Sequence, residues 1–198
     1  MTKLKVFVAE SVSPEEFYQR DWEGRVVEEI VRLLDGKASY RIVLNAELLL
    51  RAIKAASKNA YDVFHLSCHG NKSGIGLTTV KRTISWEKLA DLFQKADHVP
   101  SVLVLSSCVG GDRGIARAFA ERKRRPGVIF GAEADDEDVL TFPTACITWP
   151  ILYTSLATTG KNPKAFKDAV KKMNLIAPHR FVYRRWDGKK YRRYPSKP

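Results

Sequence analysis

Short runs of branched apolar residues alternate along the chain with longer stretches whose apolar positions recur at helical spacing. The runs predict strands over residues 5–9, 40–44, 61–66, 101–107 and 128–132. The spacing predicts helices over about 15–34, 46–57 and 85–93, from about 112, from about 162, and in a stretch interrupted by Pro143 and Pro150. Strands that alternate with helices indicate an α/β fold, in which helices cover both faces of a mostly parallel sheet.

Two consecutive strands end in residues that can carry out chemistry. The third is followed by Cys68-His69-Gly70, and the fourth by Cys108-Val109-Gly110-Gly111. In a sheet of this kind ligands bind beyond the carboxyl ends of the strands, and neighbouring strands lie about 4.8 Å apart. We therefore expect His69 and Cys108 to lie at one edge of the sheet, within working distance of each other.

A His beside a Cys at such an edge indicates nucleophilic catalysis. A thiol attacks as a thiolate, and His69 can serve as the base that removes the proton from Cys108. The helix that begins after Gly111 adds the positive end of its dipole. Backbone N–H groups at Gly70 and Cys108 are candidates to hold an oxyanion. The pattern is that of acyl transfer by a cysteine peptidase.

The other cysteines and histidines have simpler interpretations. A single Cys after a strand is more often a small buried residue than a nucleophile, so the catalytic interpretation of Cys108 depends on its pairing with a His. Cys68 is expected to point away from the site, Cys146 to pack inside a helix, and His65 to be buried in its strand. No metal-ligand spacing and no glycine-rich phosphate loop is found, so the sequence predicts no metal and no cofactor.

The segments VFHLSCHG (63–70) and VLVLSSCVGG (102–111) resemble the two catalytic motifs of CHAT-type caspase-like cysteine peptidases. In that family, as in caspases and their relatives, a His-Gly follows one strand and a Ser-x-Cys follows the next. The resemblance extends over about residues 5–173 and matches His69 and Cys108 to the catalytic dyad. It implies a three-layer caspase-like sandwich and a cysteine endopeptidase that forms an acyl-enzyme.

The resemblance places a peptidase domain in residues 1–178 and leaves residues 179–198 as a basic extension with no counterpart in the family. CHAT domains usually accompany helical repeats or other sensor modules, and none is recognisable here. We therefore expect a regulatory or sensor protein that is encoded separately and that releases this chain as an effector acting on protein or peptide substrates.

Relatives specific for basic residues carry acidic groups at the catalytic edge. Glu10 leaves the first strand at that edge, and Asp135 and Asp136 follow the fifth. These carboxylates can bind an Arg or Lys side chain before the scissile bond. Metacaspase-like enzymes have an Asp two positions before the Cys, where this chain has Ser106. An equally good interpretation is that the acids are solvated loop residues of a basic protein.

The net charge of +12 is concentrated in two places, residues 113–125 and residues 180–197. In the second, two strand-prone runs flank Asp187-Gly188, which predicts a β-hairpin. Such basic surfaces are usually solvated, but they can also bind phosphates. A second hypothesis is therefore a non-catalytic module that contacts nucleic acid or an acidic protein through this hairpin. A third is a small-molecule hydrolase that uses the same dyad.

Length and cysteine content give the remaining expectations. A chain of 198 residues is long enough for one domain with its own core. Three cysteines without paired spacing argue against a disulfide framework and for a reducing compartment. No apolar run approaches the ~20 residues that cross a bilayer. The sequence predicts a cytoplasmic protein without membrane contact.

Overall fold

The computed structural model describes residues 3–133, 140–177 and 180–196. Its main sheet has the strand order β2-β1-β3-β6-β7-β8-β9, parallel from β2 to β7. The strands are β1 (Lys5–Ser11), β2 (Lys37–Ile42), β3 (Val63–Asn71), β4 (Gly74–Gly76), β5 (Ile84–Ser85), β6 (Val102–Ser106), β7 (Val128–Glu133), β8 (Arg180–Trp186) and β9 (Tyr191–Tyr194). The helices are α1 (Pro14–Gln19), α2 (Glu23–Leu33), α3 (Ala46–Lys58), α4 (Trp86–Gln94), α5 (Arg113–Ala120), α6 (Phe142–Thr159) and α7 (Pro163–Ile176).

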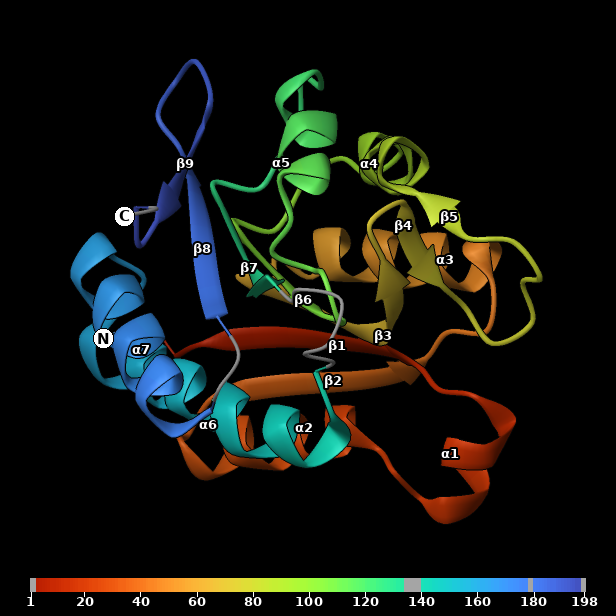
Figure 1. Ribbon diagram of the computed structural model, residues 1–198, viewed down its shortest axis with the longest axis horizontal. Helices are drawn as coiled ribbons and strands as arrows, with labels where there is room; N and C mark the ends of the chain where they lie inside the picture. The colour runs from red at the N-terminus through yellow and green to blue at the C-terminus, as the bar shows by residue number, and fades with distance from the viewer. Residues whose placement is uncertain (1–2, 134–139, 178–179, 197–198) are drawn as a thin grey trace.

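The sheet is the middle of three layers (Figure 1). Because successive side chains of a strand point to opposite faces, each strand contributes to two cores. Phe64 and Leu105 pack with α3, α4 and α5, whereas Val8 and Val104 pack with α2, α6 and α7. The α/β class and the three-layer arrangement predicted from the sequence are confirmed. No described helix is both long and apolar enough to span a bilayer.

Most helix starts are where the sequence predicts them. The side chains of Asn45, Ser85, Asp112 and Asn162 each accept a backbone N–H in the first turn of the following helix. Such caps satisfy donors that the helix itself leaves unpaired. The two prolines predict a late start or a kink, and α6 starts late, with Pro143 in its first turn, and continues through Pro150. Buried packing of α6 against α2 and α7 outweighs the roughly 3 kcal/mol penalty of a proline in a helix.

The helix predicted over 15–34 is wrong in its continuity. Arg20 adopts a left-handed conformation, with φ 64°, and ends α1, so α2 starts only at Glu23. The start of α2 is held against the sheet, since a Cβ on Gly24 would lie 2.8 Å from the Tyr40 ring and 2.9 Å from Val8. The break leaves a polar crossing segment at the carboxyl edge of the sheet.

The third predicted strand is longer than expected. β3 continues through His69, which pairs with Gly76 of the short strand β4.

The C-terminal hairpin differs from a free appendage, because β8 pairs antiparallel with β7 and buries Phe181 and Tyr183 in the core. Gly188, with φ 99°, lies in the predicted turn. Residue 178, where the sequence suggests a domain boundary, lies outside the described residues.

Candidate active site

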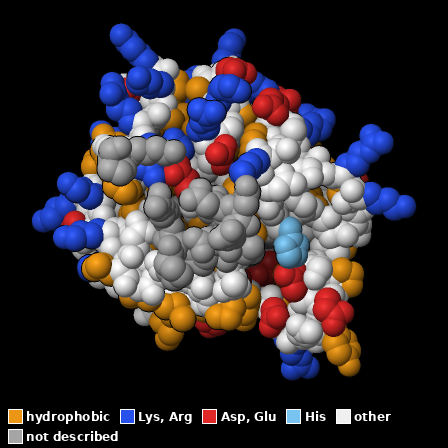
Figure 2. All heavy atoms as spheres, viewed as in Figure 1, with side chains coloured by type: hydrophobic (Ala, Val, Ile, Leu, Met, Phe, Trp, Pro, Cys, Tyr) orange, Lys and Arg blue, Asp and Glu red, His pale blue; other side chains and the backbone are white. Residues whose placement is uncertain are grey.

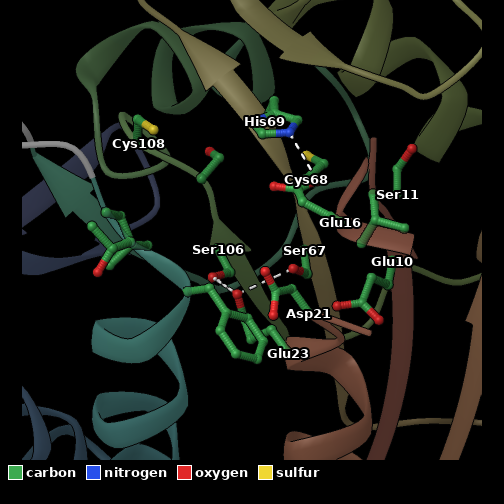
Figure 3. Close-up of a pocket in the computed structure, with 15 residues that line it drawn as sticks. Glu10, Ser11, Glu16, Asp21, Glu23, Ser67, Cys68, His69, Ser106 and Cys108 are labelled. Carbon is green, nitrogen blue, oxygen red and sulfur yellow. Dashed lines mark hydrogen bonds and ion pairs between the residues drawn. The ribbon is translucent and has the colours of Figure 1, made fainter. Parts of the chain in front are cut away.

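The register of the sheet brings polar strand ends together. Glu10 of β1 is paired with Ser67 of β3, and Ser67 with Ser106 of β6. Residues paired in this way point to the same face. His69 and Cys108 follow on the same two neighbouring strands, and all five residues line a cavity of about 80 Å³ (Figure 3). This confirms the prediction that the strand ends carrying His69 and Cys108 are neighbours at one edge of the sheet.

His69 lies at the rim of this cavity. Its side chain is 60% exposed, and its Nε2 atom lies 3.1 Å from Oε2 of Glu16 on α1. In the view of Figure 3 the imidazole lies between Cys108 and Glu16 and is turned toward Glu16. Among the described residues no hydrogen bond joins the imidazole to the Cys108 thiol. The structure thus brings both members of the predicted dyad to one cavity, with the His held by a carboxylate.

Cys108 lies on a tightly packed loop between β6 and α5. A Cβ on Gly131 would lie 2.2 Å from the carbonyl carbon of Gly110, so the loop backbone lies directly on β7. The Gly111 N–H donates to Ala132 O at 2.8 Å. The Cys108 N–H donates to no group within the described ranges, as an oxyanion donor requires.

The basic hairpin supports this loop from the outside. Arg184 of β8 is 8% exposed, and its Nε donates to the Gly111 carbonyl at 2.9 Å. Arg184 and Arg193 both pair with Glu133 at the end of β7. These two arginines therefore belong to the scaffold behind Cys108 and are not free cations of a solvated tail.

The other two thiols are held in their protonated form. Cys68 is buried, and burial, together with the nearby charge of Glu23, raises the pKa of its thiol well above the usual range. Burial and the charges of Glu23 and Glu10 raise the pKa of Cys146 to about 12. Because the thiolate is the reactive form, both environments disfavour nucleophilic attack. Cys108, which is half-buried at the cavity, is therefore the remaining candidate nucleophile.

Ser107 is an unexpected feature of the site. Its side-chain oxygen is buried and has no hydrogen-bond partner among the described residues, although the residue lines the cavity. A Cβ on Gly70 would lie 2.9 Å from both Cβ and Oγ of Ser107, so only glycine fits there. Buried hydroxyls are almost always paired. Ser107 thus places a buried hydroxyl, unpaired within the described ranges, directly beside Cys108 in the chain.

Glu10, a predicted substrate contact, is fully buried and already bonded. Its two oxygens accept from Gly24 N at 2.7 Å and from the Tyr40 hydroxyl at 2.6 Å. Burial raises the pKa of Glu10 to about 7, against the lowering effect of these two hydrogen bonds. Glu10 contributes to the cavity wall, but its oxygens have partners within the protein. The other two predicted contacts, Asp135 and Asp136, lie outside the described residues.

A second carboxylate lies at the floor of the cavity. Glu23, the first residue of α2, accepts from the hydroxyls of Ser106 at 2.8 Å and Ser67 at 3.1 Å (Figure 3), and its Oε1 atom lies 2.9 Å from His65 Nε2. His65 is buried as predicted. Its Nδ1 atom lies 2.7 Å from the hydroxyl of Tyr153 on α6. The position where metacaspase-like enzymes have an Asp is thus a serine bonded to a glutamate from another element.

Three acidic residues of the site are missed by the sequence analysis: Glu16, Asp21 and Glu23. All three belong to the segment that crosses from β1 to α2, which the sequence assigns to one continuous helix. The available signal is topological, since a chain that leaves β1 must pass the carboxyl edge before its return helix begins. Asp21 is half-buried and lines the cavity, and its carboxylate accepts no hydrogen bond from the described part of the chain.

No protein-family model matches the chain, and no curated protein matches it. Among solved structures, the chain is similar to a secreted C11 cysteine protease from Bacteroides thetaiotaomicron called iotapain, with a TM-score of 0.59 and 11% sequence identity. The fold is caspase-like. The match covers 93% of this chain and 66% of that protein, so the chain spans less than two thirds of its length. At this identity the likeness establishes the fold alone, and the CHAT assignment stays a prediction from the motifs.

Proposed function

We propose that this protein is a cysteine endopeptidase in which Cys108 is the nucleophile and His69 the general base and acid. The observation that carries the proposal is the meeting of these residues at one cavity on a caspase-like sheet. The protonated state of Cys68 and Cys146 supports the choice of nucleophile. The similar solved structure is described as a cysteine protease, which agrees with this chemistry.

The reaction proceeds through a thioester. Cys108 Sγ attacks the peptide carbonyl while His69 takes the thiol proton, and the carbonyl oxygen becomes an oxyanion bound by the backbone N–H groups of Cys108 and Gly70. His69 then gives the proton to the leaving amine as the C–N bond breaks. A water molecule, deprotonated by His69, hydrolyses the thioester and restores the free thiol.

The proposed substrates are peptides with Arg or Lys before the scissile bond. The cavity is lined by four acidic side chains and by no Lys or Arg within the described ranges. Asp21 is the best candidate to bind the substrate cation, because Glu10, Glu16 and Glu23 have partners in the protein. We further propose that a separately encoded protein regulates the peptidase as a cytoplasmic effector.

The test is a peptide carrying an electrophilic warhead after an arginine, with the adduct mapped by mass spectrometry. We expect modification at Cys108, loss of labelling in Cys108→Ala and retained labelling in Cys68→Ala. Cleavage profiles of wild type and Cys108→Ala over a proteome-derived peptide pool then give the preferred residue. Labelling that is absent from Cys108 in the folded protein, with and without a lysate that supplies a regulator, contradicts the proposal.

A further inference from the structure

The Glu16 carboxylate is the only hydrogen-bond partner of the His69 imidazole among the described residues. The two residues are 53 positions apart in the chain, and their side chains meet at 3.1 Å between Nε2 and Oε2. An ionised carboxylate only accepts hydrogen bonds, so the Nε2 atom that faces it carries the proton. In the neutral ring the free lone pair is then on Nδ1, the atom that can take a proton from a thiol.

Glu16 is itself fixed by its own helix. Its Oε2 accepts the backbone N–H of Ser13 at 2.7 Å, and the Ser13 hydroxyl accepts the N–H of Glu16, which together form a capping box at the start of α1. Burial works to raise the pKa of Glu16. The Ser13 N–H and the charge of His69 lower it by more, so the pKa lies below its usual value. The carboxylate is therefore ionised and preoriented at neutral pH.

α1 contributes no buried side chain to the core. None of its residues is buried, and Phe17 and Tyr18 are 51% and 86% exposed. Its ring contact between Phe17 and Trp22 and its capping box hold it at the edge of the sheet. A short helix without a buried face contributes little to the core. Its contribution to the cavity is the carboxylate that it presents to His69.

We propose that Glu16 is the positioning residue of His69, fixing the tautomer that leaves Nδ1 free to accept the Cys108 proton. This inference rests on the proposed peptidase function and adds a third member to its dyad. The proton moves from Cys108 Sγ to His69 Nδ1, and the resulting imidazolium is stabilised by the Glu16 carboxylate. Glu16 neither contacts the reacting atoms nor changes its own protonation state during the cycle.

The test compares Glu16→Gln with two matched variants. Gln keeps the length of the side chain and can still complete a capping box, so the variant removes the charge and keeps the helix. Ser13→Ala weakens the cap and leaves the carboxylate. Glu15→Gln removes an exposed carboxylate from the same first turn. The readouts are kcat and KM for a fluorogenic peptide, with the unfolding midpoint of each variant as a control for folding.

We expect Glu16→Gln to lower kcat by about 10-fold to 100-fold and to leave KM within about twofold, because orientation of the base affects the chemical step. Glu15→Gln should match wild type, and Ser13→Ala should lower kcat less than Glu16→Gln. Unchanged kcat in Glu16→Gln overturns the inference, as does an equal loss in Ser13→Ala, which would show that the helix cap alone matters.

A second readout does not depend on activity. Nitrogen NMR of the imidazole in wild type should show the Nε2–H tautomer for His69, with the signal identified by its loss in His69→Ala. Glu16→Gln should shift the population toward Nδ1–H. If wild type neither cleaves peptides nor labels at Cys108, the peptidase proposal fails while this spectrum still decides the role of Glu16. A mixed tautomer in wild type overturns the positioning role.

Discussion

The acidic residues at the carboxyl edge of the sheet and the lysines at its amino edge differ in charge and in how their side chains are held. At the carboxyl edge Glu10, Glu16 and Glu23 each accept hydrogen bonds from named donors around a cavity. At the amino edge Lys123 and the hairpin residues Lys189 and Lys190 are exposed, and none of them pairs with an acid in the described part of the chain. Figure 2 shows acidic side chains gathered around a hollow on the α1 side and Lys and Arg side chains toward the hairpin.

The difference separates a preorganised group of bonded carboxylates from exposed lysines that are unpaired among the described residues. Carboxylates that line the cavity and accept hydrogen bonds from the protein keep fixed positions. Catalysis and specific recognition require such fixed positions. Unbonded lysines on a hairpin act at longer range and are screened by salt. A net charge of +12 therefore says little about the site, where the local charge has the opposite sign.

The largest expected effect comes from removing Glu23, the acceptor shared by Ser67, Ser106 and His65. Glu23→Ala leaves the donors on Ser67, Ser106 and His65 without their acceptor. We expect a loss of about 3–5 kcal/mol in the free energy of unfolding, since each buried unpaired donor costs about 1–3 kcal/mol. Glu23→Gln should lose less, because rotating hydroxyls can adapt to the amide.

Urea unfolding measures these differences, and the matched variant is Lys189→Ala at the opposite edge. As an exposed substitution it should change the free energy of unfolding by no more than about 0.5 kcal/mol. If Glu23→Ala is as mild as Lys189→Ala, the hydrogen bonds at the carboxyl edge contribute nothing measurable and the contrast between the edges fails.

The pH dependence of stability provides the next test. The pKa of Glu10 is about 7 in the folded protein, above the ordinary value of 4.5. The folded state therefore binds more protons than the unfolded state between these values, so the contribution of Glu10 to stability is full below pH 4.5 and is lost as pH rises to 7. The loss is about 3 kcal/mol, because one pKa unit corresponds to about 1.4 kcal/mol.

Glu10→Gln should remove this dependence. We subtract the free energy of unfolding of wild type from that of the variant. This difference should be about 3 kcal/mol more positive at pH 8 than at pH 4.5, because only wild type loses stability as pH rises. Other titrating groups cancel in the subtraction. A difference that does not change with pH would show that the pKa of Glu10 in the folded protein equals its ordinary value, so burial does not disfavour the carboxylate.

The elements that the sequence predicts well are those fixed by local chemistry. Asn45 and Ser85 cap helices as expected, and the two apolar runs before Cys68 and Cys108 form neighbouring buried strands. Apolar periodicity and capping depend on residues a few positions apart, so they can be recognised without the fold. That the ends of these two strands are neighbours follows from the alternation of strands and helices along the chain.

The positions of Glu16, Asp21 and Glu23 at the cavity could not be predicted in the same way. The break at Arg20 depends on contacts from other elements, including the approach of Gly24 to Tyr40 and Val8. No Gly or Pro interrupts residues 15–22, so local propensity favours one continuous helix. Without the break, Asp21 and Glu23 would belong to a helix surface. The split into α1 and α2 places them at the cavity instead.

Asp21 is the cavity carboxylate through which substrate preference can be tested. Asp21→Asn should lower kcat/KM for an arginine reporter by about 10-fold to 100-fold, which corresponds to one charge-assisted hydrogen bond of about 1.5–3 kcal/mol. A reporter with an uncharged residue before the scissile bond should be affected much less. Asp97→Asn, near the amino edge, is the matched control. Equal losses for both reporters would assign Asp21 a structural role.

The smallest expected effect concerns the amino edge and the alternative role of binding nucleic acid. Lys123, Arg124, Arg125 and Trp186 line a hollow of about 460 Å³ there, and Arg125 lies over the Trp186 ring at 4.1 Å. Reversal of charge at Arg184 or Arg193 is unsuitable as a test, because both hold Glu133.

The suitable variant is Lys189→Glu combined with Lys190→Glu, measured with a fluorescent 20-nucleotide single strand. Affinity should fall about fivefold to tenfold, and the salt dependence should weaken by about 0.7 in logarithmic slope for each phosphate that the variant no longer neutralises. Peptide cleavage should not change, because the hairpin tip lies at the amino edge of the sheet and the cavity at the carboxyl edge. If wild type does not bind the strand at low salt, the amino edge is a solvated surface and the function lies at the carboxyl edge alone. Reduced cleavage in the variant, with the fold intact, would instead show that the two edges are coupled through β8 and Arg184.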